Sequence, residues 1–125
     1  MLLIWEKSYI AGFMDGEGCI YAHPSALYIQ IEIAQKIKAP LFFIADRYGG
    51  NVRKCKNIYK WLCPSKNIEK FLIDIIPFLL VKNVQAKAAL EYRGLQGSRN
   101  SSSINMIRRI ELCKIISEDK HASFI

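Results

Sequence analysis

Residues 27–34, LYIQIEIA, alternate between apolar and other side chains, and this alternation restricts the fold more than any other feature of the sequence. In an extended strand it places Leu27, Ile29, Ile31 and Ile33 on one side and Tyr28, Gln30, Glu32 and Ala34 on the other. Such a strand belongs to a sheet that packs against apolar partners on one face and meets water on the other. We therefore expect helices to cover only one face of a sheet.

The sequence on either side of this strand alternates between helical and extended patterns. Apolar residues recur at helical spacing at 5–14, 40–48, 66–76, 84–95 and 104–117. Extended patterns cover 18–23, 51–56 and 58–63. Glycines should end the first helix at 16 or 18 and the second at 49 and 50, and Pro77 interrupts the third. The order predicts an α+β fold with one four-stranded antiparallel sheet and additional C-terminal helices.

The uncovered face of this sheet would carry polar, aromatic and basic side chains. Its members would be Cys19, Tyr21, His23, Tyr28, Gln30, Glu32, Arg53, Cys55, Ile58 and Lys60. A strand of about six residues spans roughly 20 Å, so this face is long enough to lie along a groove of duplex DNA. An ordinary solvated sheet face has the same polarity, so the pattern alone leaves both interpretations open.

The chain is basic for its length. Its 125 residues suit one domain, and 18 Lys and Arg against 11 Asp and Glu give a formal net charge of +7. That excess favours a polyanionic partner, because each basic residue placed on a phosphate releases condensed counterions. A soluble protein that is merely basic, or an organellar or ribosomal protein, would show the same charge.

The cysteines and the apolar runs argue against other classes. Cys19, Cys55, Cys63 and Cys113 form no Cys-x-x-Cys pair, and neither histidine lies near them at zinc-ligand spacing, so a structural zinc site is not expected. The sequence has no charged-then-apolar leader, and its apolar runs stop well short of about 18 residues. We expect a soluble protein of a reducing compartment, without a membrane partner.

The stretch YIAGFMDGEGCIYA, residues 9–22, begins as a helix with a glycine in its interior. Gly12 costs about 1 kcal/mol relative to alanine at such a position, so a compensating contact is expected. Together with Ala11 it forms a surface with almost no side chain. Either this surface packs against the chain's own sheet, or the helix packs tightly against a second copy of itself.

The same stretch places two acids where the end of a helix is already negative. Unpaired carbonyls and the helix dipole make Asp15 and Glu17 unfavourable there unless a cation joins them. Oxygen ligands without His or Cys suit Mg²⁺ better than zinc. A turn with two solvated acids is the alternative interpretation.

The segment IAGFMDGEG resembles the defining motif of the LAGLIDADG homing endonucleases, and the similarity continues through Ala86. The order of elements is similar to the αββαββα core of that family, here at about residues 4–96, followed by a C-terminal loop and helix at about 97–125. The resemblance implies one endonuclease domain. Because only one motif is present, it also implies a homodimer whose motif helices pack together at Ala11, Gly12 and Asp15.

The resemblance implies a role for each acid of the motif. Glu17 matches the essential metal-binding acid, with the Gly16 carbonyl as a further ligand, and Asp15 matches an acid that is mainly structural. The implied metal is Mg²⁺, for which Mn²⁺ or Ca²⁺ can substitute in binding. The implied activity is metal-dependent phosphodiester hydrolysis that makes a double-strand break in a long, partly palindromic DNA site.

Two further segments resemble active-site segments of the family. IAQK places Gln35 where the family positions water near the scissile phosphate, and PFLLVKNVQA places a basic active-site residue at Lys82. A strand-end turn residue and a solvated helix-end lysine are the alternatives. Relatives can carry an arginine just after the glutamine, and Lys38 is the candidate for that charge here.

The DNA contacts implied by the resemblance divide into two groups. The side chains expected at the bases are Tyr28, Gln30, Glu32, Arg53 and Lys60, and those expected at phosphates are Lys54, Lys56 and Arg99. Tyr21, His23 and Lys38 are further DNA-binding candidates. The alternative function keeps the fold without cleavage, as an RNA-binding maturase of the host intron or a non-cleaving DNA-binding protein. An intron-encoded protein of this kind would be intracellular, in a mitochondrion or chloroplast if organelle-encoded and otherwise in a microbial cytoplasm.

Overall fold

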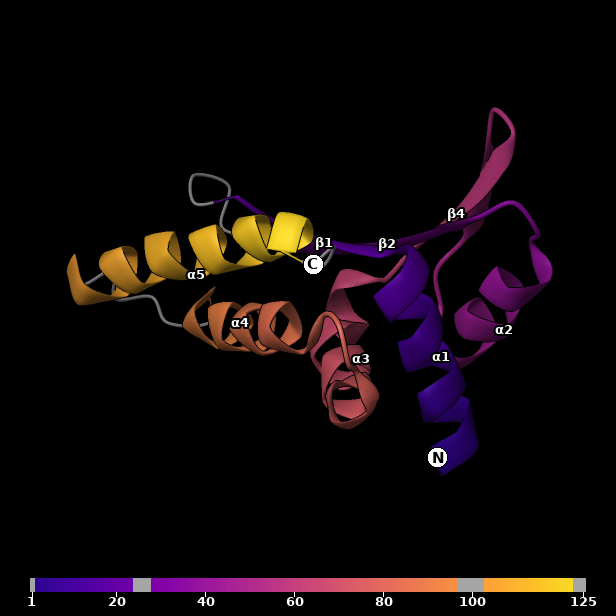
Figure 1. The fold of residues 1–125 in the computed structure, drawn as a ribbon, viewed down its shortest axis with the longest axis horizontal. Coiled ribbons are helices and arrows are strands. Elements are labelled where there is room, and N and C mark those ends of the chain that lie inside the picture. The colour runs from indigo at the N-terminus through magenta and orange to yellow at the C-terminus, as the bar shows by residue number, and fades with distance from the viewer. Residues whose placement is uncertain (1, 24–27, 97–102, 123–125) are drawn as a thin grey trace.

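The structure of the chain is a computed structural model that describes residues 2–23, 28–96 and 103–122 (Figure 1). Its main elements are α1 (Ile4–Glu17), β1 (Gly18–His23), β2 (Tyr28–Gln35), α2 (Ala39–Tyr48), β3 (Val52–Cys55), β4 (Ile58–Leu62), α3 (Ile68–Ile75), α4 (Asn83–Gln96) and α5 (Ser103–Ala122). Short 3₁₀ turns, η1 (Ser65–Asn67) and η2 (Ile76–Phe78), precede and follow α3. This succession agrees with the order expected from the sequence.

The strands form one antiparallel sheet in the order β1-β2-β4-β3. Neighbouring residues on β2, β4 and β3 form rows across the sheet. The row of Ile33, Trp61 and Val52 faces the helices, and the next row, Ala34, Lys60 and Arg53, faces the other side. This arrangement confirms the predicted α+β fold with a four-stranded antiparallel sheet.

The core lies between the sheet and the helices. β2 buries Ile29, Ile31 and Ile33, which the alternation assigns to the covered face. Figure 1 shows α1, α2, α3 and α4 on one side of the sheet, while α5 packs against α4 and contacts β1. Since burying a side chain such as isoleucine contributes about 1.5–3 kcal/mol, this one-sided burial determines which face of the sheet stays open.

Two glycines allow α2 to approach the sheet closely. Gly49 and Gly50 have φ angles of 79° and 89°, a region that side chains disfavour. A Cβ atom on Gly50 would lie 2.6 Å from the Leu62 carbonyl oxygen. Trp61 Nε1 donates a hydrogen bond to the Gly49 carbonyl at 2.8 Å. The glycine pair that ends α2 therefore also docks it on β4.

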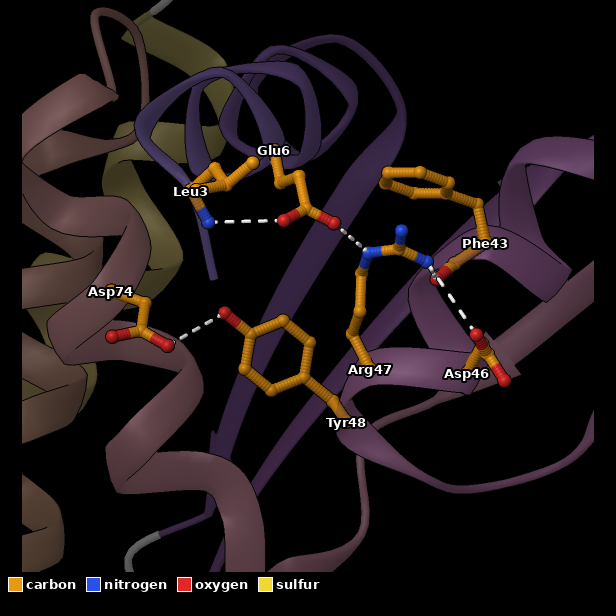
Figure 2. A network of polar contacts seen from close by, with 7 residues as sticks. All are labelled: Leu3, Glu6, Phe43, Asp46, Arg47, Tyr48 and Asp74. Carbon is orange, nitrogen blue, oxygen red and sulfur yellow. Dashed lines mark hydrogen bonds and ion pairs between the residues drawn. The ribbon is translucent and has the colours of Figure 1, made fainter. Parts of the chain in front are cut away.

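A polar network fixes the first turn of α1 to α2 (Figure 2). Glu6 accepts hydrogen bonds from the Leu3 backbone N–H, at 3.0 Å, and from Arg47 Nε. Arg47 also donates to the Phe43 carbonyl at 3.0 Å, and its guanidinium lies over the Phe43 ring. The Leu3 hydrogen bond and, after it, the Arg47 hydrogen bond lower the pKa of Glu6, so the network favours the ionised carboxylate.

A second contact fixes α2 to α3. The buried Tyr48 hydroxyl donates to Asp74 at 2.8 Å (Figure 2). Burial, followed by this hydrogen bond, raises the pKa of Tyr48 well above its ordinary value. Lys7 of α1 lies 3.8 Å from the other carboxylate oxygen of Asp74. These contacts hold the N-terminal half of α1 in place, and its last turn leads directly into β1.

Two helices have boundaries that differ from the expected ones. The helix expected at 66–76 begins at Ile68, because Asn67 is non-helical (φ −110°, ψ 3°) and its side-chain amide donates to the Tyr48 carbonyl at 2.7 Å. The last helix continues to Ala122 rather than ending near 117. The connection expected at 24–26 lies outside the described residues.

Candidate functional site

The carboxylate of Asp15 is engaged by the chain itself. It accepts backbone hydrogen bonds from Leu80 at 2.7 Å, Val81 at 3.1 Å and Lys82 at 2.9 Å. These N–H groups immediately precede α4, whose first turn lacks helical partners for its donors. Asp15 therefore connects the end of α1 to the start of α4, although Asp15 and Lys82 are 67 residues apart in the sequence.

The side chain of Lys82 also contacts Asp15. Its Nζ donates to the Asp15 backbone carbonyl at 2.7 Å. The last turn of α1 contains no basic residue, so Lys82 supplies from elsewhere in the chain the cation that a helix C-terminus favours. The structure thus brings Lys82 to the end of α1 that carries the two acids.

Glu17 has different surroundings. Its side chain is exposed, and in the part of the chain that the structure describes it makes no hydrogen bond or ion pair. One residue earlier, the Gly16 carbonyl belongs to the last turn of α1, where carbonyls lack helical partners. Glu17 and Gly16 are therefore exposed at the end of α1, whereas both carboxylate oxygens of Asp15 accept backbone hydrogen bonds.

Two surface hollows meet at Glu17 and Gln35. The first, of about 430 Å³, runs along α1 and is lined by Ser8, Tyr9, Gly12, Phe13, Gly16, Glu17 and Gln35. The second, of about 290 Å³, lies at the end of the sheet and is lined by Glu17, Ala34, Gln35, Lys36 and Ile58. The two residues shared by both hollows stand where the exposed side of α1 meets the end of β2.

Gln35 has part of its amide engaged. Its Oε1 accepts the backbone N–H of Lys36 at 2.8 Å, and among the described residues its Nε2 has no hydrogen-bond partner. Gln35 is the last residue of β2 and lies opposite Tyr59 of β4. This end position turns its amide toward the hollow that contains Glu17.

The oxygen donors at the end of α1 fit a hard divalent cation in part. Among the described residues no group of three His, Cys, Asp or Glu side chains could hold a metal ion. Mg²⁺, however, is usually bound by one or two carboxylates with waters and substrate phosphates. The exposed carboxylate of Glu17 and the carbonyl of Gly16 match that chemistry, with waters and DNA phosphates as the further ligands.

The exposed side of α1 is apolar and contains two glycines. A Cβ atom added at Gly12 or at Gly16 would meet no atom within 4 Å, so the chain's own packing does not require a glycine at either position. Trp5 and Tyr9, on the same helix, are 58% and 41% exposed. The interpretation in which Gly12 packs against its own sheet is therefore wrong.

Ala11 lies on the other side of the helix. Its side chain is fully buried, as are those of Ile10 and Met14, because the turn of about 100° per residue places these three toward the core. Of the two residues expected to form the contact surface between copies, Gly12 is therefore exposed and Ala11 is buried in the chain's own core. Tyr9 and Phe13 were not predicted as part of this surface, although they lie one helical turn apart on either side of Gly12 and line the same hollow.

The open face of the sheet carries most of the side chains expected at DNA bases. The register pairs Cys19 with Glu32, Tyr21 with Gln30, His23 with Tyr28, Arg53 with Lys60 and Cys55 with Ile58. These pairs alternate with the buried rows, as the sequence predicted. The His23 side chain is outside the described part. A hydrogen bond with Cys19 and, after it, burial raise the pKa of Tyr21 to about 12.

The remaining basic candidates are not all on this face. Lys54 lies opposite Tyr59, so its side chain is on the other face of the sheet from that of Arg53. Lys56 is in the β3–β4 turn, with a φ of 58°. Lys38 is the exposed N-cap residue of α2. Arg99 lies outside the described residues. The structure therefore brings Lys54 and Lys56 to one hairpin.

Comparison with known proteins places the fold. No protein-family model matches this sequence, and no curated protein matches it. Several solved structures of homing endonucleases do match over nearly the whole chain, so the chain has the homing-endonuclease fold. This confirms the fold that the resemblance to the LAGLIDADG family implies. In the described ranges no helix is long and apolar enough to cross a membrane.

Three of these structures illustrate the similarity. The homing endonuclease I-CvuI, in complex with its target in the presence of Ca, gives a TM-score of 0.74 at 19% identity, covering 93% of this chain and 82% of that one. The archaeal intron-encoded homing endonuclease I-Vdi141I, complexed with DNA, gives 0.75 at 20% identity over 92% and 84%. The homing endonuclease I-TnaI gives 0.60 at 19% identity over 91% and 92%.

Proposed function

We propose that this chain is a LAGLIDADG homing endonuclease that makes a site-specific double-strand break in DNA. The observation that carries the proposal is the position of Glu17 and Gln35, which line both the hollow along α1 and the hollow at the end of the sheet. A phosphate of DNA lying on the open sheet face would reach these two side chains at the edge of that face. Similar folds are solved in complex with DNA.

Glu17 and the Gly16 carbonyl would hold a divalent ion, Mg²⁺ in the first instance. When bound, the ion would polarise the scissile phosphate and lower the pKa of water. The similar enzyme I-CvuI was solved with its own target in the presence of Ca, and with the I-CreI target in the presence of Mg, where the DNA was not cleaved. A divalent metal accompanies the DNA in both cases, which supports one here. Asp15 is not available as a ligand in the same way, because both of its carboxylate oxygens accept backbone hydrogen bonds.

Gln35 and Lys82 would act on the reacting groups. The Gln35 amide has an Nε2 that can donate to a water or a phosphate oxygen at the hollow. Lys82 carries three donors and uses one on the Asp15 carbonyl. Its positive charge at the end of α1 would stabilise negative charge that develops on a phosphate bound there. Lys38 is the further basic candidate near α2.

Two copies of the chain would complete the enzyme. One chain supplies a single open carboxylate at the end of α1, and cutting both strands requires two active sites. The exposed glycines of α1 offer a surface on which a second α1 can approach closely, and large exposed apolar patches usually mark interaction sites. A homodimer would also double the open sheet face and suit a long, partly palindromic site.

The biological role that follows is intron homing. One similar structure is of an intron-encoded enzyme, and a net charge of +7 favours a nucleic-acid partner. The protein would then act where its target DNA lies, inside a cell or an organelle. Binding to the host intron RNA is compatible with the same basic surface.

Cleavage of a DNA library tests the proposal directly. Purified protein is incubated with Mg²⁺ and a randomised or genomic DNA library, and the sequences at the broken ends are determined. We expect one enriched site that the protein linearises when it is cloned into a plasmid. Glu17→Gln should still bind this site and should not cut it, whereas Glu69→Gln, at a similarly exposed acid of α3, should cut normally.

Two results would contradict parts of the proposal. Cleavage by Glu17→Gln at the rate of the unmodified protein would remove Glu17 from the metal site. A protein that enriches a DNA sequence by binding and never cuts it, with any of Mg²⁺, Mn²⁺ or Ca²⁺, would be a non-cleaving DNA-binding protein of the same fold.

A further inference from the structure

The open face of the sheet contains an acid among its basic side chains. Glu32 of β2 and Lys60 of β4 both belong to this face, and Lys60 Nζ lies 3.7 Å from Glu32 Oε1. The two positions are diagonal neighbours, because Lys60 is opposite Ala34 while Glu32 is opposite Leu62. An acid is repelled by DNA phosphates, so its presence on a DNA-binding face calls for a specific reason.

The distance between the two groups leaves both with capacity for another partner. At 3.7 Å the contact is longer than a hydrogen bond, for which about 2.7–3.2 Å is usual. The ammonium of Lys60 carries three donors, and a carboxylate accepts at about four positions. Both side chains are partly accessible, 37% for Lys60 and 16% for Glu32. The pair therefore presents a donor beside an acceptor toward any molecule on the face.

The edge of a G·C base pair in the major groove carries the complementary pattern. Guanine offers the acceptors N7 and O6, and cytosine offers the N4 donor next to O6. N4 and O6 are joined by the hydrogen bond of the base pair, so they lie about 2.9 Å apart, close to the separation of Nζ and Oε1. We propose that Lys60 donates to guanine and Glu32 accepts from cytosine of one G·C pair in each half-site, an inference that rests on the proposed function.

An A·T pair fits the same two side chains less well than a G·C pair does. Beside the adenine N6 donor it presents the thymine O4 acceptor and the thymine methyl group. In the orientation that places O4 against the carboxylate of Glu32, two acceptors face each other without a proton. In the opposite orientation Glu32 accepts from N6 and Lys60 donates to O4, but Lys60 then meets the thymine methyl group where guanine offers a second acceptor, N7. Because the Glu32–Lys60 pair is neutral, it adds selectivity rather than overall affinity.

Binding selection with matched variants tests this reading. The unmodified protein, Glu32→Gln and Lys60→Gln are each used to enrich randomised duplex DNA in Ca²⁺, so that bound DNA is recovered whether or not it is cut. We expect the unmodified protein to fix a G·C pair at one position of each half-site. Either substitution should lower the preference at that position at least about fivefold and leave the other positions unchanged.

Exchange of the two charges gives the sharpest result. The double variant Glu32→Lys with Lys60→Glu should select the reversed pair, C·G, at the same position. Lys54→Gln is the matched control: it removes the same charge from the same hairpin, but Lys54 alternates with Arg53 and points away from the open face. It should weaken binding without changing the base profile.

The outcomes separate this inference from the proposed function. A base profile that stays the same in Glu32→Gln, in Lys60→Gln and in the exchanged variant overturns the reading of a G·C pair and leaves the endonuclease function untouched. Failure of the unmodified protein to enrich any sequence overturns the proposed function and this inference with it. Thermal melting is compared first, and the single variants decide where the exchanged variant does not fold.

Discussion

At the scale of single residues, Asp15 and Glu17 lie two positions apart in the sequence but have different surroundings. Asp15 satisfies three backbone donors ahead of α4, while Glu17 meets solvent at the junction of two hollows. Spacing in the sequence could not separate these roles, because the partners of Asp15 lie at Leu80, Val81 and Lys82. Only the resemblance to a known motif pointed to Glu17 as the metal-binding acid.

Substitution of the two acids should therefore affect the stability of the fold to different extents. Asp15→Asn removes one acceptor oxygen and the charge from three hydrogen bonds, and hydrogen bonds to charged groups contribute about 1.5–3 kcal/mol. We expect a loss of about 1–3 kcal/mol in the free energy of unfolding, measured by urea denaturation. Glu17→Gln should change this free energy by less than about 0.5 kcal/mol, because the described chain holds no partner for its carboxylate.

Cleavage provides the second measurement for the same pair. Glu17→Gln should abolish cutting in a folded protein, and Asp15→Asn should reduce it through the displacement of Lys82. The division of roles is contradicted if Glu17→Gln destabilises the fold as much as Asp15→Asn does.

Lys82 is held at the end of α1 by its hydrogen bond to the Asp15 carbonyl. Lys82→Met keeps much of the length of the side chain and removes its charge, so it should lower the cleavage rate by about ten- to a hundredfold or more, in the range expected for an electrostatic contribution to catalysis. DNA binding in Ca²⁺ should change far less. Equal losses of binding and cleavage would instead make Lys82 an ordinary phosphate contact.

At the scale of elements, the sequence predicted the sheet better than the helix ends. The alternation at Ile29, Ile31 and Ile33 was sufficient to choose the buried face, since a shift by one residue would expose all three. The start of α3 could not be read locally, because Asn67 is held out of the helix by a hydrogen bond to the Tyr48 carbonyl, which is distant in sequence. Local patterns contain no information on such partners.

The Glu6–Arg47 contact gives the helices a pH-dependent link. The pKa of Glu6 is lowered in the folded chain from an ordinary value of 4.5. Its stabilising contribution is therefore complete above that value and is lost as the pH falls through the lowered pKa. We expect the urea midpoint to decrease on acidification below pH 4.5, and Glu6→Gln to make this decrease smaller.

A control separates Glu6 from the other acids. Glu17→Gln changes an exposed acid that has no partner among the described residues, so the acid-induced decrease should remain as it is in the unmodified protein. If Glu6→Gln and Glu17→Gln behave alike, the acid sensitivity of the fold arises elsewhere.

At the scale of the whole molecule, Gly12 argues for a second chain. A glycine inside a helix is unfavourable by about 1 kcal/mol, and the chain's own packing leaves open space around this one. The sequence alone could not decide between an internal and an external contact, because both require a small residue. The structure removes the internal contact, and the apolar hollow along α1 lies where a partner helix would pack.

Leucine at this position should therefore spare the fold and disrupt assembly. Gly12→Leu meets no atom within 4 Å in the single chain and improves helix propensity by about 0.8 kcal/mol, so the unfolding free energy of the monomer should not fall. Sedimentation should show a dimer for the unmodified protein and a monomer for the variant. Without a second open carboxylate beside it, the variant should leave at least one DNA strand uncut.

Gly94 provides the matched comparison for this test. It also lies within a helix, α4, and a side chain there likewise meets no atom within 4 Å. Gly94→Leu should therefore gain the same helix propensity and still form the dimer. Normal dimerisation of Gly12→Leu would move the interface away from α1, whereas loss of dimerisation in both variants would mean that α4 takes part in it as well.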